Sequence, residues 1–338
     1  MKKISLLWVT IFVVISMSLL GCSDNEEVNS NNNNDTTSNN DTDFPTEKIT
    51  IINPWSPGGS SDVMIRQLAK ELEETDLINE NVVVENREGG GGTVAASDIA
   101  NKESDGYTLM ISSNSVFTST PHTRDLSYEL NDFSIVHGMT REQLLVAVPG
   151  ESSIDSLDDL MKSDTIKWGT AGGGGFIQLA GETLLEESNI NDIRHVTFDG
   201  GEPTVNALMS NDLDMALIHP GEVKSQLDSG DIKPIAVLAN ERSEFLPDTP
   251  TVQEEGYEDI DMSITKFIMI PEGAPDNVIN VLQEAIAEAW ESDSYQEFLT
   301  QNYLDPYKDN NDEIFNFLEE EYDFIGQQME ELDFGEET

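Results

Sequence analysis

The sequence has a single cysteine, four histidines and few positive charges. One cysteine cannot form an internal disulfide, so the fold must be stable without a disulfide framework. Lysine and arginine number 17 against 66 aspartate and glutamate residues, which gives a net charge of −49. A protein of this charge repels the nucleic-acid backbone, which excludes nucleic acid as a partner. The acidic residues occur in every segment, a distribution typical of a solvated surface.

The motifs of several enzyme classes are also missing. The sequence has no G-x-x-x-x-G-K-[ST] loop for nucleoside triphosphates, no H-E-x-x-H zinc motif and no G-x-S-x-G turn for a serine nucleophile. The histidines, at His122, His137, His195 and His219, are dispersed, and each is expected to be structural or solvent-facing. We predict a protein without catalytic activity, cofactor or metal. An extracellular hydrolase is the alternative from another class, and it would need a positioned nucleophile and base.

Long apolar runs are missing except at the N-terminus. Lys2 and Lys3 precede a 17-residue apolar stretch, Ile4–Leu20, which is the pattern of a secretion signal. The stretch leads into Gly21 and Cys22 and resembles a bacterial lipobox, in which the cysteine is acylated. We therefore predict a signal peptide at 1–21 and a lipid anchor on Cys22, on the extracytoplasmic face of the cell membrane. A plain signal peptide with an incidental buried cysteine is the alternative.

Residues 22–45 are predicted to form a disordered tether. From Ser23 to Asp43 nearly every residue is Asn, Asp, Ser, Thr or Glu, too polar to offset the entropy cost of folding. A flexible chain of this length has a root-mean-square reach of about 25 Å. Removing residues 1–21, which contain two lysines and no acids, makes the net charge −51. About 295 residues follow the tether, enough for two domains of ordinary size.

Strand-like and helix-like segments alternate from Glu47 onward, which predicts α/β architecture with largely parallel sheets. In the first set, strands are expected at 49–52, 82–84, 107–112 and 144–148, and helices at 63–74 and 93–100. In the second set, helices are expected at 154–161, 178–187 and 204–210, and strands at 166–169, 195–198, 215–218 and 235–238. A strand at 263–270 and two periodic helices, 278–290 and 312–332, complete the pattern. Two such sets predict two α/β domains.

The segment Asn53–Asp62 joins the first strand to the first helix and contains Pro57, Gly58 and Gly59. Such a junction presents free backbone N–H groups and the positive end of a helix, which together bind an anion without a charged side chain. Ser60, Ser61 or Asp62 is expected to cap the helix. A plain turn with Asp62 as the cap fits the spacing equally well.

The segment Trp168–Phe176 repeats this arrangement in the second set, with glycine at all four positions 172–175. Four glycines cost more chain entropy than a turn requires, which favours a ligand loop over a linker. Two such loops, one per domain, predict a ligand held between the domains. A third run, Gly89–Gly92, fits a loose dinucleotide pattern but follows the second strand instead of the first, so it is not assigned to a cofactor.

Taken together, the motifs resemble the substrate-binding proteins of tripartite tricarboxylate transporters, the Bug family. The matching segments are Pro57–Asp62, Val82–Gly92, Asp105–Leu109, Trp168–Gly175, Leu179–Glu182, Phe198–Leu208 and Leu246–Tyr257. The resemblance implies a two-domain, periplasmic-binding-protein-like fold (a Venus flytrap), with crossover strands at 144–148 and 263–270 and C-terminal helices that return to the first domain. Domain 1 is then expected at 46–146 and 264–338, and domain 2 at 147–263.

The resemblance also implies a function. The family binds citrate, other di- and tricarboxylates or amino acids through main-chain amides and hydroxyls, and delivers them to a large and a small membrane permease subunit. The expected ligand-binding residues are Pro57, Gly58, Gly59, Ser60, Ser61, Asp62, Ser113, Thr170, Gly172, Gly174, Gly175, Phe176, Asp199, Gly200, Gly201 and His219.

Three of these positions depart from the family's pattern. Many family members have serines at the positions of Gly175 and Phe176, and often a lysine at that of Asp199. The loss of hydroxyls and of a cation favours a monocarboxylate, or a ligand whose amino group meets Asp199. A ligand-presenting sensor subunit for a membrane receptor shares the implied fold and is the alternative to a transport protein.

Overall fold

Two sheets that share one long strand organise the part of the chain described by the computed structural model. This part consists of residues 44–171, 175–186, 188, 190–198, 200–257, 260–309, 311–332 and 334. The predicted signal peptide, Cys22 and nearly all of the predicted tether lie outside it. Among the described residues, no helix combines the length and the apolar character needed to cross a membrane.

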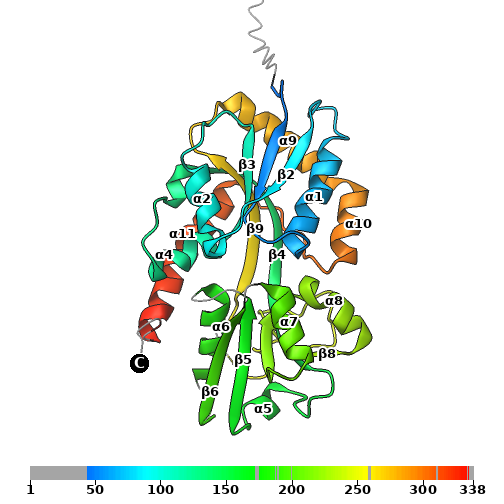
Figure 1. The fold of residues 1–338 in the computed structure, drawn as a ribbon, viewed down its shortest axis with the longest axis vertical. Coiled ribbons are helices and arrows are strands. Elements are labelled where there is room, and N and C mark those ends of the chain that lie inside the picture. The colour runs from blue at the N-terminus through cyan, green and yellow to red at the C-terminus, as the bar shows by residue number, and fades with distance from the viewer. Residues whose placement is uncertain are drawn as a thin grey trace, which may run out of the picture. The chain divides into compact units, whose positions relative to one another are not determined.

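The first sheet contains β1 (Ile49–Asn53), β2 (Val82–Asn86), β3 (Thr108–Ser113), β9 (Ser263–Pro271) and the first part of β4 (Phe133–Pro149). Strand β1 pairs in parallel with β2 and β3, whereas β9 runs antiparallel to both β3 and β4. Helices α1 (Ser60–Leu72), α9 (Asp276–Glu291) and α10 (Asp293–Gln301) share one hydrophobic cluster with this sheet (Figure 1). Helices α2 (Thr93–Ile99) and α3 (Ser115–Thr118) share a second hydrophobic cluster with the sheet. The short elements η1 (Gly90–Gly92), α4 (Thr120–Thr123) and η2 (Leu130–Asp132) lie in the connections. We call this assembly the first lobe.

Side chains of the first sheet alternate between the two helical layers, as the two-residue period of a strand requires. Ile49 and Ile51 of β1 pack in the cluster with α1, whereas Ile52 packs in the cluster with α2. On β9, Ile268 and Ile270 face the α1 cluster, and Phe267 faces the α2 cluster. On β9, therefore, an even-numbered residue faces the α1 cluster and an odd-numbered residue faces the α2 cluster.

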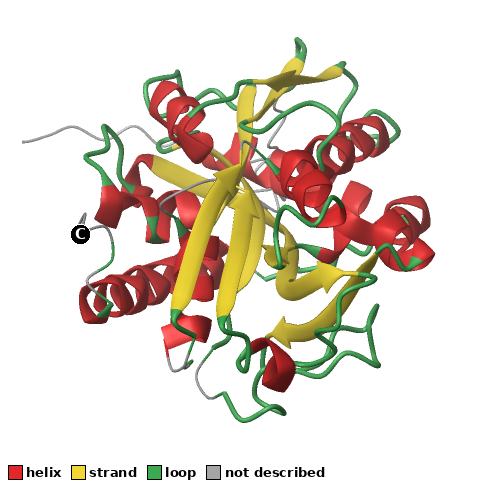
Figure 2. Cartoon of the chain, turned by 60° about the horizontal axis from the view of Figure 1, so that its bottom comes forward, coloured by secondary structure: helices red, strands yellow, loops and turns green. Residues whose placement is uncertain are grey.

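The second sheet contains β5 (Thr165–Ala171), β6 (Asp192–Phe198), β7 (Met215–Ile218), β8 (Ile232–Leu238) and the last part of β4. Strand β5 pairs in parallel with β6 and β7, and β4 pairs antiparallel with β7 and β8. Helices α5 (Leu157–Leu160) and α6 (Phe176–Glu186) share one hydrophobic cluster with the sheet, and α7 (Gly201–Met209) and α8 (Pro220–Ser229) share the other. Figure 2 shows this second lobe from below, with helices on both sides of the strands.

Strand β4 connects the lobes. Residues 133–143 pair with β9 in the first sheet, and residues 144–149 pair with β7 and β8 in the second. Strand β9 enters the first sheet at Ser263, opposite Gln143, so both strands cross at the same level. The strands then follow one path, β2-β1-β3-β9-β4-β7-β5-β6, with β8 attached to β4. The predicted α/β fold with two crossover strands is confirmed.

Two aspects of the sequence prediction were wrong. The sheets are mixed instead of largely parallel, because the crossover strands run antiparallel to their neighbours. Strand β4 begins at Phe133, eleven residues before the expected strand. Its first part carries polar side chains, His137, Thr140 and Glu142, that are buried by neighbouring elements and hide the alternation of an ordinary strand.

Helix α11 (Asn311–Glu331) packs against both lobes. Ile314 and Leu318 belong to the cluster under α2 and α3, whereas Ile325 and Met329 belong to the cluster under α6. The resemblance implied that the C-terminal helices return to the first domain; α9 and α10 pack there, but α11 bridges the lobes. The domain boundaries at 46–146, 147–263 and 264–338 stay a prediction.

Candidate ligand-binding site

The first loop, residues 53–62, connects β1 to α1 and is exposed at its tip. Ser56, Pro57, Gly58 and Gly59 are exposed, Ser60 is half-buried, and Ser61 and Asp62 are buried. Gly58 has φ +82°, a left-handed conformation that glycine adopts without strain. The sharp turn that this allows brings the loop back over the start of α1.

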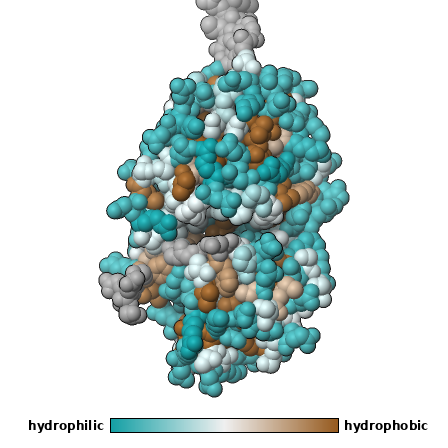
Figure 3. Space-filling model, in the orientation of Figure 1, coloured by the Kyte–Doolittle hydropathy of each residue, from teal (hydrophilic) through white to brown (hydrophobic). Residues whose placement is uncertain are grey.

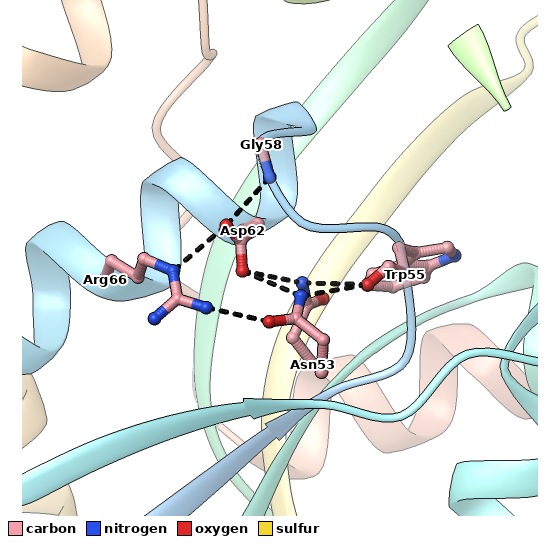
Figure 4. Close-up of polar contacts among 6 residues, drawn as sticks. Asn53, Trp55, Gly58, Asp62 and Arg66 are labelled. Carbon is pink, nitrogen blue, oxygen red and sulfur yellow. Dashed lines mark hydrogen bonds and ion pairs between the residues drawn. The ribbon is translucent and has the colours of Figure 1, made fainter.

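No side chain caps α1, which corrects the expectation for Ser60, Ser61 and Asp62. The N-cap residue is Gly59, and no side-chain hydrogen bond satisfies the first turn. The carboxylate of Asp62 instead points back into the loop and accepts a hydrogen bond from the Gly58 backbone N–H at 2.9 Å (Figure 4). The first-turn N–H groups of a helix have no intrahelical partner, so they are left for a ligand or water.

Asp62 is the centre of a hydrogen-bonded network under the loop. Its Oδ2 also accepts from Arg66 Nε at 3.0 Å, and its Oδ1 accepts from Asn86 Nδ2 at 2.7 Å and Asn53 Nδ2 at 3.4 Å. Burial opposes ionisation, but the hydrogen bonds from Arg66, Gly58 and Asn86 outweigh it and lower the pKa of Asp62 to about 2. A permanently charged Asp62 therefore fixes the shape of the loop, with its oxygens engaged within the protein.

Asn53 and Asn86 are two residues of this network that sequence reasoning missed. Both amides also donate to the backbone oxygen of Trp55, at 3.3 Å and 3.0 Å, and the Asn86 side-chain oxygen accepts from Arg66 Nη2 at 2.7 Å. They are direct partners in the register of β1 and β2. A signal existed, because Asn53 and Asn86 follow the predicted strands 49–52 and 82–84 within two residues, and ligand sites form at the carboxyl ends of parallel strands.

The end of β3 adds a second polar group of the first lobe. Ser113 is buried, and its Oγ lies 2.9 Å from Ser115 Oγ. Asn114, another residue that was missed, donates to the Ser263 backbone oxygen at 3.0 Å and to both carboxylate oxygens of Glu321 on α11. Burial raises the pKa of Glu321 to about 7, although Asn114 and Thr118 counteract it. Ser113 thus lies beside a contact that ties β3 to β9 and to the bridging helix.

In the second lobe, the described ends of the glycine loop are held by β6 and by the core. Thr170 is buried, and its Oγ1 lies 2.9 Å from His195 Nε2. The His195 ring lies 4.2 Å from the Trp168 ring, and burial lowers the pKa of His195 to about 4. Phe176 begins α6, but its ring is buried in the core cluster with Trp168, so only its backbone can face a ligand.

One predicted site residue of the second lobe, Gly175, approaches the first lobe. A Cβ placed on Gly175 would lie 3.9 Å from Ser119 Oγ, so the start of α6 faces the junction of α3 and α4. Figure 3 shows a mostly hydrophilic surface that is hollowed at the level where the lobes meet. Gly172, Gly174 and Asp199 lie outside the described residues.

Gly200 and Gly201 stand at the start of α7. A Cβ on Gly201 would fall 2.7 Å from the carboxyl carbon of Glu222, so a side chain at this position would displace the end of the Glu222 side chain. His219 occupies the N-cap position of α8 and is buried, and its Nδ1 has no partner among the described residues. His219 lies close enough to Glu142 of β4 to help lower the pKa of that carboxyl.

A fold of two α/β lobes, joined by two crossover strands and carrying an uncapped strand-to-helix junction beside the lobe boundary, defines a solute-binding protein. The sequence profile of the tripartite tricarboxylate transporter family receptor matches residues 64–334, and the chain belongs to this family. The resemblance drawn from the motifs is confirmed.

Relatives and solved structures agree with this assignment. A UPF0065 protein of Bordetella pertussis is 27% identical over 295 residues, which cover 86% of this chain and 90% of the relative. A Rhodopseudomonas palustris protein solved with adipate has a TM-score of 0.79 at 24% identity, covering 86% of this chain and 99% of its own. MatC from Rhodopseudomonas palustris, solved with bound malate, has a TM-score of 0.76 at 21% identity, covering 84% and 99%. At these identities the two structures show the shared fold.

Proposed function

We propose that this receptor captures a small carboxylate between its lobes, with the N-terminus of α1 as the main anion-binding element. The observation that carries the proposal is the uncapped first turn of α1 beneath a loop whose shape the charged Asp62 network fixes. Backbone N–H groups at a helix N-terminus bind carboxylates without a cationic side chain. The loop needs little rearrangement on binding, which lowers the cost of association.

The two fold neighbours carry adipate and malate, which are small dicarboxylates. The second lobe would complete the site from the start of α6, because Gly175 faces Ser119 of the first lobe. Whether one or two carboxylates are held depends on the second-lobe loops, where a ligand amino group could also meet Asp199. The proposal therefore covers mono- and dicarboxylates and amino acids.

A ligand screen of the chain without its predicted signal and anchor, residues 23–338, tests the proposal. Thermal unfolding is followed with malate, adipate, citrate, acetate and aspartate, each tested singly, and with adipamide as an uncharged control. A ligand at 100 times its dissociation constant raises the unfolding free energy by about 2.7 kcal/mol. We expect at least one carboxylate, and not adipamide, to raise the unfolding temperature. If none does, the carboxylate proposal is wrong.

The variant Gly59→Val locates the site. Gly59 has an ordinary φ of −71°, and a Cβ there would meet only the Ser56 backbone oxygen at 3.5 Å, so the backbone at this position accepts a side chain. The larger side chain would obstruct the approach to the first turn of α1. We expect calorimetry to show a loss of affinity of roughly tenfold or more, and Gly59→Ala to show a smaller loss. Unchanged affinity in Gly59→Val would move the site away from this loop.

We further propose that the protein is anchored by a lipid on Cys22 at the extracytoplasmic face and delivers its ligand to a large and a small permease subunit. The support is the lipobox-like sequence before Cys22 and the family to which the chain belongs. In the variant Cys22→Ser the protein should be released or keep an uncut signal. If the Cys22→Ser variant is found in membrane fractions at normal size and level, the lipid anchor is contradicted. A ligand-presenting sensor subunit remains the alternative partner role.

A further inference from the structure

Lys266 and Glu142 form an unusual ion pair at the junction of the lobes. Lys266 Nζ lies 2.7 Å from Glu142 Oε1, and the two side chains are 5% and 0% exposed. In every other ion pair among the described residues, at least one side chain is more than a quarter exposed. Among the described residues, Lys266 is the one lysine or arginine that is buried.

The pair stands where β4 and β9 leave the first sheet. Lys266 is the register partner of Thr140 on β4 and of Ser113 on β3. Glu142 belongs to the last pair but one between β4 and β9. Lys266 is an even-numbered residue of β9, like Ile268 and Ile270, so its side chain is directed to the layer that contains α1. The ammonium group therefore lies beneath the first loop, at the boundary of the lobes.

Stability alone gives no reason for this pair. Moving two charges out of water is costly, and replacing a buried ion pair by apolar residues of similar volume often leaves a protein equally stable or more stable. The protein also has a net charge of −49, which opposes the approach of any anion. A buried cation beside an anion-binding helix end offsets this repulsion locally.

The contacts of Lys266 reach toward the proposed ligand. Its Nζ lies 3.5 Å from the Oγ of Ser60, the first residue of α1. An ammonium group has three N–H donors. Glu142 Oε1 takes one and also accepts from Thr140 Oγ1 at 2.8 Å, so this oxygen is shared. Lys266 therefore retains donor capacity on the side of the helix end.

A histidine and two acidic side chains lie near the pair. Glu142 faces His219 of the second lobe and Asp305, and Asp305 also faces Glu244. The second carboxylate oxygen of Glu142, Oε2, has no hydrogen-bond partner among the described residues. Glu142 thus holds Lys266 in place and at the same time cancels part of its charge.

We propose that Lys266 is a specificity-determining residue that selects anionic ligands: its ammonium group is shared between Glu142 and a ligand carboxylate at the N-terminus of α1. The inference rests on the proposed function, because it assumes a carboxylate at that helix end. It assigns opposite effects to the two partners. Lys266 strengthens carboxylate binding, and Glu142 weakens it by competing for the same charge.

Two single variants test these opposite effects by calorimetry with the carboxylates of the ligand screen. Lys266→Met removes a charge-assisted hydrogen bond, and we expect the dissociation constant to rise roughly ten- to hundredfold. Glu142→Gln frees the ammonium from its anion while keeping the shape of the side chain, and we expect affinity to rise roughly threefold or more. If the pair only held the lobes together, both variants would lower affinity or neither would change it.

A single variant leaves one charge buried without its partner and could unfold, so the double variant Lys266→Met/Glu142→Gln accompanies the test. It contains no unpaired charge at this place, and we expect it to fold and to bind as weakly as Lys266→Met. The control Lys162→Met makes the same charge change in an exposed pair with Asp158, and its affinity should stay within twofold of wild type.

The outcomes separate the two proposals. If the wild type binds none of the carboxylates, the proposed function fails, and this inference fails with it. If the wild type binds a carboxylate and the double variant binds it equally well, only the role of Lys266 is overturned. Weaker binding by Glu142→Gln would also overturn the inference, because it would show that the pair acts as a structural unit.

Discussion

The two lobes present a strand-to-helix junction by different physical means. In the first lobe, the loop between β1 and α1 is held by hydrogen bonds and one ion pair that converge on the buried Asp62. In the second lobe, Trp168 supports the junction between β5 and α6 from the core, with the His195 ring on it and Gly181 of α6 against it. Loss of polar partners should therefore damage the first junction, and a change of volume should damage the second.

The largest expected effect tests the packing of the second junction. In Gly181→Ala the new Cβ would lie 2.2 Å from Cζ3 of Trp168, whose side chain is 1% exposed and cannot move without disturbing the core. Overpacking costs typically about 1–3 kcal/mol, and a contact this short against a fixed ring belongs at the upper end; the roughly 1 kcal/mol that alanine adds as a better helix former offsets part of it. We expect the unfolding free energy in urea to fall by about 2 kcal/mol.

The matched control is Gly326→Ala in α11. Its Cβ would lie 2.6 Å from Cε1 of His122, an exposed ring that stacks on Tyr322 and lies 3.0 Å from the Tyr322 backbone oxygen through Nε2. Moving this exposed ring costs less than moving buried Trp168, and helix propensity adds up to about 1 kcal/mol, so we expect stability to change by less than about 1 kcal/mol. Equal losses in both variants would show that the contact with Trp168 is not what makes Gly181 necessary.

The second prediction concerns the polar network of the first junction. Asp62→Ala leaves Asn53, Asn86 and the Gly58 N–H without their common acceptor, and we expect a loss of about 1–3 kcal/mol in unfolding free energy. Ligand affinity should fall as well, because the loop loses its fixed shape. Urea unfolding and calorimetry with the same carboxylates measure the two effects.

Asp158→Ala provides the comparison for this network. Asp158 of α5 also pairs with a cation four residues further along the chain, Lys162, but both side chains are more than two-thirds exposed. Such pairs contribute little, so stability should change by no more than about 0.5 kcal/mol and affinity should not change. If Asp62→Ala behaves like this control, the network does not hold the loop.

The same contrast explains what could be predicted from the sequence. Both junctions were located, because glycine runs after apolar strands are local signals that need no knowledge of the fold. The Asp62 network was predicted only as a helix cap, since its partner Asn86 is brought near by the pairing of β1 with β2. The pair Lys266–Glu142 joins residues 124 positions apart, and only the register of β4 with β9 places them together. Because Glu142 is polar and buried, the first part of β4 also lacks the alternation of polar and apolar residues that identifies a strand in a sequence.

The smallest expected effect is a difference in pH response between the second junction and the contact of α11 with the first lobe. Glu321 has its pKa raised to about 7 by burial, above its ordinary value of 4.5, so the folded state binds this proton more tightly than the unfolded state. Its contribution to stability therefore increases as the pH falls from about 7 toward 4.5. Asp305, with its pKa raised to about 7 by burial and by Glu142, acts in the same direction.

His195 has the opposite sign. Burial lowers its pKa from 6.5 to about 4, so the unfolded state takes up the proton first and stability decreases as the pH falls from about 6.5 toward 4. Because these side chains are partly screened by solvent, each contribution should be on the order of 1 kcal/mol. Urea unfolding at pH 5 and pH 7 measures the change in unfolding free energy on acidification. Relative to wild type, Glu321→Gln should shift this change toward a loss, and His195→Gln should shift it toward a gain. Shifts of the same sign in both variants would mean that the acidic contact and the histidine do not oppose each other.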